Sequence, residues 1–179
     1  MEKETLEDTF RQGLIGKRIL EIKLYSINGL SFNIKDCDRQ ILDAGIEFSL
    51  DEGVFSFGWN SAHEVLNATL APMSEMCTEE DIQTFSTAND HYWRQQKGKK
   101  IAAVDFHFNW IQYPDQPKIF IPDMVKIRLE NNFEMLMAAM QYEIAGEGCH
   151  DFALNSEEDI VVFFDPEEVA EMWDEHSKK

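Results

Sequence analysis

Residues 45–59 read GIEFSLDEGVFSFGW, and this stretch sets the kind of fold that the chain forms. On both sides of the acidic turn at residues 51–53, apolar residues alternate with polar or small ones. That alternation is the period of a strand with one buried face. The stretch therefore predicts an antiparallel hairpin. The side chains expected on its buried face are Ile46, Phe48, Leu50, Phe55, Phe57 and Trp59.

A similar unit recurs in the second half of the chain. Residues 16–19 (GKRI) are matched by 98–101 (GKKI), and residues 46–51 (IEFSLD) by 125–130 (VKIRLE), in the same order. We therefore predict a partial internal duplication that relates residues 13–60 to residues 95–142. The alternative is chance similarity, because all alternating strands resemble one another. A C-terminal strand and helix, residues 159–175, have no evident counterpart in the first half.

Helices are expected at the N-terminus, in the middle and at the C-terminus. Residues 4–12 fit a short amphipathic helix, residues 61–70 a second, and a third is expected to begin at Thr78. Asp165 and Pro166 suit the N-cap and the first position of the last helix. The buried side chains of that last helix are expected to be Val169, Met172 and Trp173.

The remaining segments complete an α+β fold. Residues 16–25 alternate as a strand with Leu20, Ile22 and Leu24 inward, and Asn28-Gly29 is a hairpin signal. Residues 36–43 and 146–156 are expected to be loops. The prediction is one domain over residues 1–179, with a mostly antiparallel sheet built from the two similar β units.

The charge of the chain bears on what it binds. Sixteen Lys and Arg stand against 34 Asp and Glu, for a formal net charge of −18. Such a field disfavours nucleic acids and anionic membranes, and it favours a basic protein partner. The alternative is that the acidity serves solubility alone.

The sequence lacks the motifs that are typical of several classes of protein. The three cysteines are far apart and form no CxxC pair, so neither a disulfide framework nor a zinc ribbon is expected. No apolar run approaches ~18 residues, and the charged start does not fit a signal peptide, so the expected compartment is the cytoplasm. P-loop, dinucleotide, nucleophile-elbow and zincin motifs are absent. We expect no cofactor and no metal.

The densest acidic stretch is the first candidate site, as a surface for a basic partner. An acidic first helical turn is also favoured by the helix dipole, so a purely solvated face is the alternative. Metal binding is disfavoured because no EF-hand spacing is present. The candidate partner-binding residues are Glu157, Glu158, Asp159, Glu167, Glu168 and Glu171.

An alternative site centres on His107. Asp105, His107 and Asn109 share one face of a strand, with Phe106, Phe108 and Trp110 on the other. An Asp–His pair can orient an imidazole for acid–base work or metal binding. The loop containing Cys149, His150 and Asp151 supplies the residue types of a thiol site. The alternative set is Asp105, His107, Cys149 and His150, and the competing interpretation is an ordinary solvent-facing strand and loop.

Short motifs connect these features to a family. The chain resembles uncharacterised small acidic bacterial proteins in three short motifs. These are the two GKRI-like strand starts, the hairpins that contain Phe48-Ser49-Leu50 and Ile127-Arg128-Leu129, and the run DIVVFFD at residues 159–165. Some of those proteins look like immunity proteins of polymorphic toxin systems. The resemblance covers residues 13–175 and carries over no functional residue. It implies a stoichiometric inhibitor whose acidic surface covers the basic active site of a toxin.

Three hypotheses for function follow. The chain is an acidic protein-binding module of the immunity type, or a small enzyme or ligand-binding protein that uses His107 with the loop at residues 149–151. The third hypothesis is a structural or oligomeric protein, in which the many aromatic residues line a dimer interface.

Overall fold

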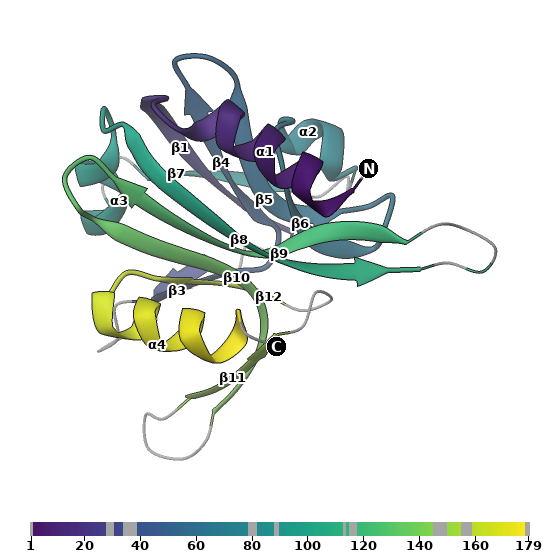
Figure 1. The fold of residues 1–179 in the computed structure, drawn as a ribbon. Coiled ribbons are helices and arrows are strands. Elements are labelled where there is room, and N and C mark those ends of the chain that lie inside the picture. Colours follow the sequence, from purple (N-terminus) through teal and green to yellow (C-terminus); the bar gives the residue numbers. More distant parts are fainter. Residues whose placement is uncertain are drawn as a thin grey trace.

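The computed structural model describes residues 2–27, 31–33, 39–78, 82–87, 90–112, 114, 118–144, 150–154 and 159–177. Helices and strands alternate along these residues in an α+β arrangement (Figure 1). The elements in chain order are α1 (Lys3–Leu14), β1 (Ile19–Ser26), β2 (Ser31–Asn33), β3 (Arg39–Leu42), β4 (Gly45–Leu50), β5 (Val54–Asn60), β6 (Val65–Thr69), α2 (Met73–Met76), β7 (Gln83–Ser86), α3 (His91–Gln96), β8 (Ile101–Ile111), β9 (Ile119–Leu129), β10 (Glu134–Ile144), β11 (His150–Leu154), β12 (Asp159–Phe163) and α4 (Pro166–His176).

The strands form two antiparallel sheets. The first sheet has the order β6-β5-β4-β1-β7, and the second has the order β2-β3-β12-β10-β9-β8 with β11 added beside β10. Each sheet contains the same path of successive neighbours, β1-β4-β5-β6 in one and β8-β9-β10-β12 in the other. The α+β class with two similar β units is thus confirmed. The strand β12 and helix α4, for which the sequence showed no counterpart, occupy the place in the path that β6 and α2 occupy in the first half.

The two GKRI-like segments lie side by side where the halves meet. The amide of Gly16 donates to the carbonyl of Ile101 at 2.8 Å, and the amide of Gly98 donates to the carbonyl of Ile19 at 2.7 Å. Both glycines have positive φ, 84° and 85°, which glycine adopts without the steric cost of a Cβ. The matched glycines therefore make the same turn out of a helix and into a strand.

A matched bulge follows each of these turns. The register shifts between Ile19 and Glu21 in the β1–β4 pair and between Ile101 and Ala103 in the β8–β9 pair. The expectation that Leu20 points inward is wrong, because the bulge turns this side chain outward and leaves it 45% exposed. Ile19 takes its place in the core.

Acidic residues close both units in the same way. The Asp51 carboxylate accepts the Arg18 amide at 2.9 Å, and the Glu130 carboxylate accepts the Lys100 amide at 3.2 Å. The first of these hydrogen bonds lowers the pKa of the Asp51 carboxyl, because it stabilises the charged form. The repeated acids thus have a structural use in each turn.

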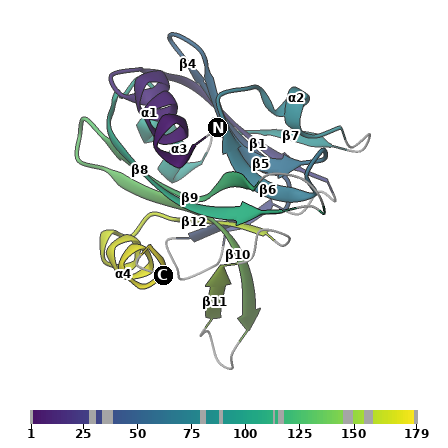
Figure 2. The same ribbon diagram turned by 45° about the vertical axis from the view of Figure 1, so that its right-hand side comes forward.

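The main core lies between the two sheets. Phe48, Phe55 and Phe57 of the first sheet belong to one cluster of buried side chains with Val125 and Ile127 of the second. The apolar face expected for residues 45–59 is confirmed, since β4 and β5 bury all of its predicted side chains except Trp59, which is half-buried. The opposite face is not left to solvent as expected, because Glu47 and Ser56 are buried as well. Helix α1 lies on one side of the molecule and α4 on the opposite side (Figures 1 and 2).

The middle of the chain differs from the prediction. Residues 65–69 form the edge strand β6 and not a helix. Glu64, the residue directly before this strand, has a positive φ of 54°. The helix expected from Thr78 is replaced by strand β7, which pairs with β1, and by the short α3. Pairing with a sheet edge and burial against it override local helix signals in these segments.

Two expected loops and one hairpin also differ. Strand β3 lies within residues 36–43 and β11 within residues 146–156. The Asn28-Gly29 signal lies outside the described residues. The strand after it, β2, pairs with β3 in the second sheet and not with β1. Among the described residues, no helix is long and apolar enough to cross a bilayer.

Candidate functional site

Helix α4 is held firmly against the second sheet. The Asp165 carboxylate caps the helix by accepting the amides of Glu167 and Glu168 at 2.9 and 3.1 Å, and Pro166 takes the first helical position. Val169 is buried, and Met172 and Trp173 pack against the same cluster, as the sequence predicted. The opposite face of the helix is therefore presented in one defined orientation.

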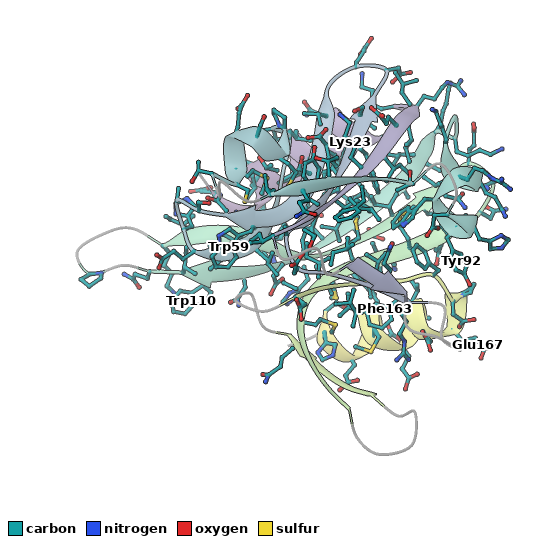
Figure 3. All side chains as sticks on the ribbon, turned by 180° about the vertical axis from the view of Figure 1, so that it is seen from behind. Lys23, Trp59, Tyr92, Trp110, Phe163 and Glu167 are labelled. Carbon is teal, nitrogen blue, oxygen red and sulfur yellow. The ribbon has the colours of Figure 1, made fainter. Side chains whose placement is uncertain are left out.

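The outward face of α4 is acidic. Successive helical residues turn by about 100°, so the carboxylates at positions 167, 171, 174 and 175 fall within about 100° of the circumference. All four residues are exposed. Figure 3 shows Glu167 at the periphery of the molecule. We call this set, Glu167, Glu171, Asp174 and Glu175, the α4 acidic face.

The other residues predicted for partner binding have different environments. Glu168 is half-buried and forms a two-point ion pair with Arg39 of β3, at 2.6 and 2.8 Å, so it anchors the helix. Asp159 is half-buried at the start of β12, and Glu157 and Glu158 lie outside the described residues. Sequence reasoning missed Asp174 and Glu175, although their spacing of three and four residues from Glu171 was a usable signal.

His107 is paired, but not with the residue that the sequence favoured. Its Nδ1 lies 2.7 Å from Oδ1 of Asp123, whose residue is 2% exposed. Asp123 sits at an irregularity of the β8–β9 register, between the pairs His107–Met124 and Phe108–Pro122. Strand β9 begins at Ile119 and runs on through Pro122. Because β9 continues through a proline and pairs with β8 in an irregular register, the local sequence contains no signal for the His107–Asp123 pair.

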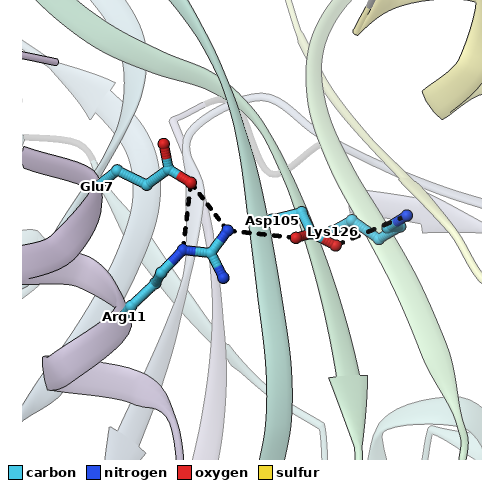
Figure 4. A network of polar contacts seen from close by, with 4 residues as sticks. All are labelled: Glu7, Arg11, Asp105 and Lys126. Carbon is cyan, nitrogen blue, oxygen red and sulfur yellow. Dashed lines mark hydrogen bonds and ion pairs between the residues drawn. The ribbon is translucent and has the colours of Figure 1, made fainter. Parts of the chain in front are cut away.

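Asp105 takes part in a network that joins α1 to the second sheet (Figure 4). Its carboxylate lies 3.4 Å from the Arg11 guanidinium and 3.7 Å from the Lys126 ammonium. Arg11 also binds Glu7 at 2.8 Å, and this hydrogen bond is the main cause of the raised pKa of Arg11. Asn109 and Trp110 are exposed beyond this network. Trp110 stays on the strand face of Phe106 and Phe108, because the extra residue in the register belongs to β9, but the burial of that face ends before Trp110.

Of the partners proposed for His107, His150 lies far from it. Cys149 lies outside the described residues, and the backbone of His150 pairs with Ile144 of β10. His107 is level with Met124 of β9, which pairs with Ala138 of β10. At ~3.3 Å per residue, the stretch of β10 from Ala138 to Ile144 separates the two histidine backbones by about 20 Å along the strand. No three potential His, Cys, Asp or Glu ligands cluster anywhere in the described part of the chain.

A cavity of about 450 Å³ lies between α1, β6 and β9. Apolar side chains form much of its wall, among them Phe10, Leu70, Phe120 and Ile121. Asn67 of β6 also lines it, and the Oδ1 atom of this amide is buried without a hydrogen-bond partner. The sequence did not predict this cavity, because residues 65–69 were expected to be helical.

Comparisons with models of protein families, with curated proteins and with solved structures found no match to this chain.

Proposed function

We propose that the protein is an acidic protein-binding module and that the α4 acidic face contacts a basic partner protein. The observation that carries the proposal is the row of exposed carboxylates on a single docked helix, in a chain with a net charge of −18. A uniform negative field accelerates the encounter with a basic protein, and a local row of carboxylates orients that protein on contact.

The attachment of α4 supports this proposal. The Asp165 cap, the Arg39–Glu168 ion pair and the stacking of Lys126 Nζ at 4.6 Å from the centre of the Trp173 ring hold the helix from both of its ends. Binding to a helix that is already ordered loses little conformational entropy. The favourable free energy of each new ion pair therefore contributes to the binding affinity.

We infer that the partner is a toxin and that the module acts as its immunity protein. An inhibitor of this kind works in a one-to-one complex by covering a basic active site. It must associate before the toxin reaches its target, so electrostatic steering is suited to the task. Steering also makes the association rate fall as salt is added, because the Debye length shortens.

Co-expression tests this function. The product of the gene that neighbours this one is expressed alone and together with the chain, and growth is measured. The expected result is growth arrest by the neighbour and restored growth with the chain present. A neighbour that has no effect on growth, or a toxic neighbour that the chain does not counteract, contradicts the immunity function.

Charge reversal tests the surface. The triple variant Glu167→Lys, Glu171→Lys, Glu175→Lys is expected to lose protection and to slow association with the purified neighbour at low salt by at least about tenfold, in the range expected for electrostatic steering. The matched control, Glu4→Lys, Asp8→Lys, Glu75→Lys, changes the net charge equally at exposed sites on α1 and α2. Equal losses in both variants would show that only total charge matters and would contradict a role for α4.

A further inference from the structure

We propose that the cavity between α1, β6 and β9 binds a small organic acid that has an apolar body and one N–H or O–H donor. This inference concerns a site separate from the α4 acidic face and does not depend on the partner-binding function.

The size and the walls of the cavity set the body of the ligand. A volume of about 450 Å³ falls in the range of small-molecule sites, which are mostly apolar with a few placed polar groups. Phe10 comes from α1, Leu70 from the end of β6, and Phe120 and Ile121 from β9. Because these side chains come from three separate elements, they surround an aromatic or branched group on several sides.

Asn67 sets the polar contact. The residue is 8% exposed, so more than nine-tenths of it is buried, and its Oδ1 has no hydrogen-bond partner. Buried amide oxygens are nearly always paired in native proteins, and the exceptions call for an explanation. Oδ1 itself is enclosed, so the Asn67 amide would have to turn toward the cavity for a ligand N–H or O–H to pair with it. That pairing would satisfy the buried oxygen, and on this basis we assign Asn67 to ligand binding.

The charges around the cavity set the remaining group. The chain has 34 acidic residues, yet among the residues that the structure describes no Asp or Glu lines the cavity, whereas Lys118 and His63 do. The Nζ atom of Lys118 lies 3.6 Å from the centre of the exposed Trp110 ring, which orients the ammonium. A carboxylate on the ligand would find the Lys118 ammonium here and no acidic side chain in the described part of the wall.

Indole-3-acetate is the probe for this site, because it combines an aromatic body, an N–H and a carboxylate. Binding is measured by calorimetry and by saturation-transfer NMR. Two analogues each lack one feature: 1-methylindole-3-acetate has no donor, and indole-3-acetamide has no charge. We expect one site for the probe and about tenfold weaker binding of each analogue, the usual effect of leaving one polar partner unpaired.

Substitutions locate the binding. Thr9→Trp places a large side chain at the cavity from the exposed surface of α1 and is expected to abolish binding of the probe. The control Thr5→Trp alters an exposed residue of the same helix that does not line the cavity, and it should leave the affinity unchanged within twofold. Asn67→Leu should remove the preference for the N–H over the N-methyl probe, and Lys118→Glu should remove the preference for the acid over the amide.

Several outcomes would overturn the inference. No detectable binding of all three probes by the wild-type chain would exclude an apolar acid site. Binding that persists in folded Thr9→Trp would place the ligand elsewhere. If Thr9→Trp does not fold, the Lys118→Glu variant decides the matter, since its exposed position tolerates substitution, and an unchanged preference for the acid contradicts the assigned orientation.

Discussion

Arg18 and Lys100 form an antiparallel bridge, and through it the first strands of the two similar β units contact each other. Around this bridge, the amide of Ile19 donates to the carbonyl of Lys99 and the amide of Ile101 donates to the carbonyl of Lys17, each at 2.9 Å. The contacts are reciprocal, as expected when two copies of one unit face each other. A duplication in ancestry remains a prediction, which this geometry supports.

The reciprocal turns yield a first prediction. Gly16→Ala and Gly98→Ala should each lower the free energy of unfolding by about 1–2 kcal/mol, because left-handed backbone costs an L-residue that much. A Cβ at either glycine would meet no atom within 4 Å, so the cost arises from the backbone alone. Urea unfolding measures the change, and asparagine at the same positions should cost less. Alanine variants as stable as the wild type would contradict this account.

The packing of α2 yields a second prediction. A Cβ on Gly45 or on Gly58 would lie 2.6 Å from the end of the Met73 side chain, but on Gly58 it would also lie 2.8 Å from the carbonyl oxygen of Ala44. Overpacking costs ~1–3 kcal/mol. We therefore expect Gly45→Ala to lower the free energy of unfolding by an amount near the lower end of this range. Gly58→Ala should lower it by an amount at or above the upper end.

A double-mutant cycle separates the two glycines. In a Met73→Ala background the cost of Gly45→Ala should fall, because the flexible side chain that it strikes is gone and only the 3.1 Å approach to the Cα of Gly58 remains. The cost of Gly58→Ala should persist, because the Ala44 carbonyl remains. Equal relief at both positions, measured by thermal or urea unfolding, would contradict this reading of the contacts.

The anchor of α4 yields a third prediction. Glu168→Gln should lower the free energy of unfolding by about 1 kcal/mol, since a two-point pair with Arg39 is stronger than an exposed ion pair. Glu171→Gln, on the exposed side of the same helix, should change stability by less than about 0.5 kcal/mol. Hydrogen exchange of the α4 amides should accelerate only in the first variant. Similar behaviour of the two variants would rule out the anchoring role.

Tyr25 yields a fourth prediction, on pH. Burial, with a smaller contribution from the Glu47 carboxylate, raises the pKa of its phenol from 10.0 to about 12. The folded state therefore keeps the proton that the unfolded state loses. The contribution to stability is fully present below pH 10 and is lost as the pH rises from 10 to about 12.

Spectroscopic titration and unfolding measure this effect. Ultraviolet absorbance should show a tyrosine ionisation near pH 12, and this late step should be absent in Tyr25→Phe. The Tyr25→Phe variant should also lose less stability than the wild type across the same pH interval. Glu47→Gln should move the late step to lower pH, and a step that does not move would exclude the carboxylate as a cause.

Local sequence predicted the elements whose signals are complete within a few residues. The alternation over residues 45–59 identified a hairpin with the correct buried face, because the period of side chains along a strand is a local property. The Asp165-Pro166 pair located the start of α4 for the same reason, since a cap and its amides lie within one turn. The first turn of α4 and the exposure of Glu167 and Glu171 were likewise predictable.

Residues 65–69 show where such reasoning fails. The four residues before this segment, 61–64 (SAHE), fit the capping box of a helix, yet residues 65–69 pair with β5 as an edge strand. The pairing depends on a partner strand and on burial of Leu66 and Ala68 in the core, neither of which is encoded within the segment. Because strand β6 was not predicted, neither the position of Asn67 nor the cavity beside it could be predicted.

By itself, the sequence determined the α+β class, the two similar β units, the excess of carboxylates and the exposure of Glu167 and Glu171 on α4, because composition and short periods carry that information. Only the tertiary structure decided that β3 joins the second sheet, that Asp123 and not Asp105 holds His107, and that a cavity lies beside Asn67. Each of these depends on atoms brought together from distant parts of the chain, which is a property of the packed sheets and not of any local pattern.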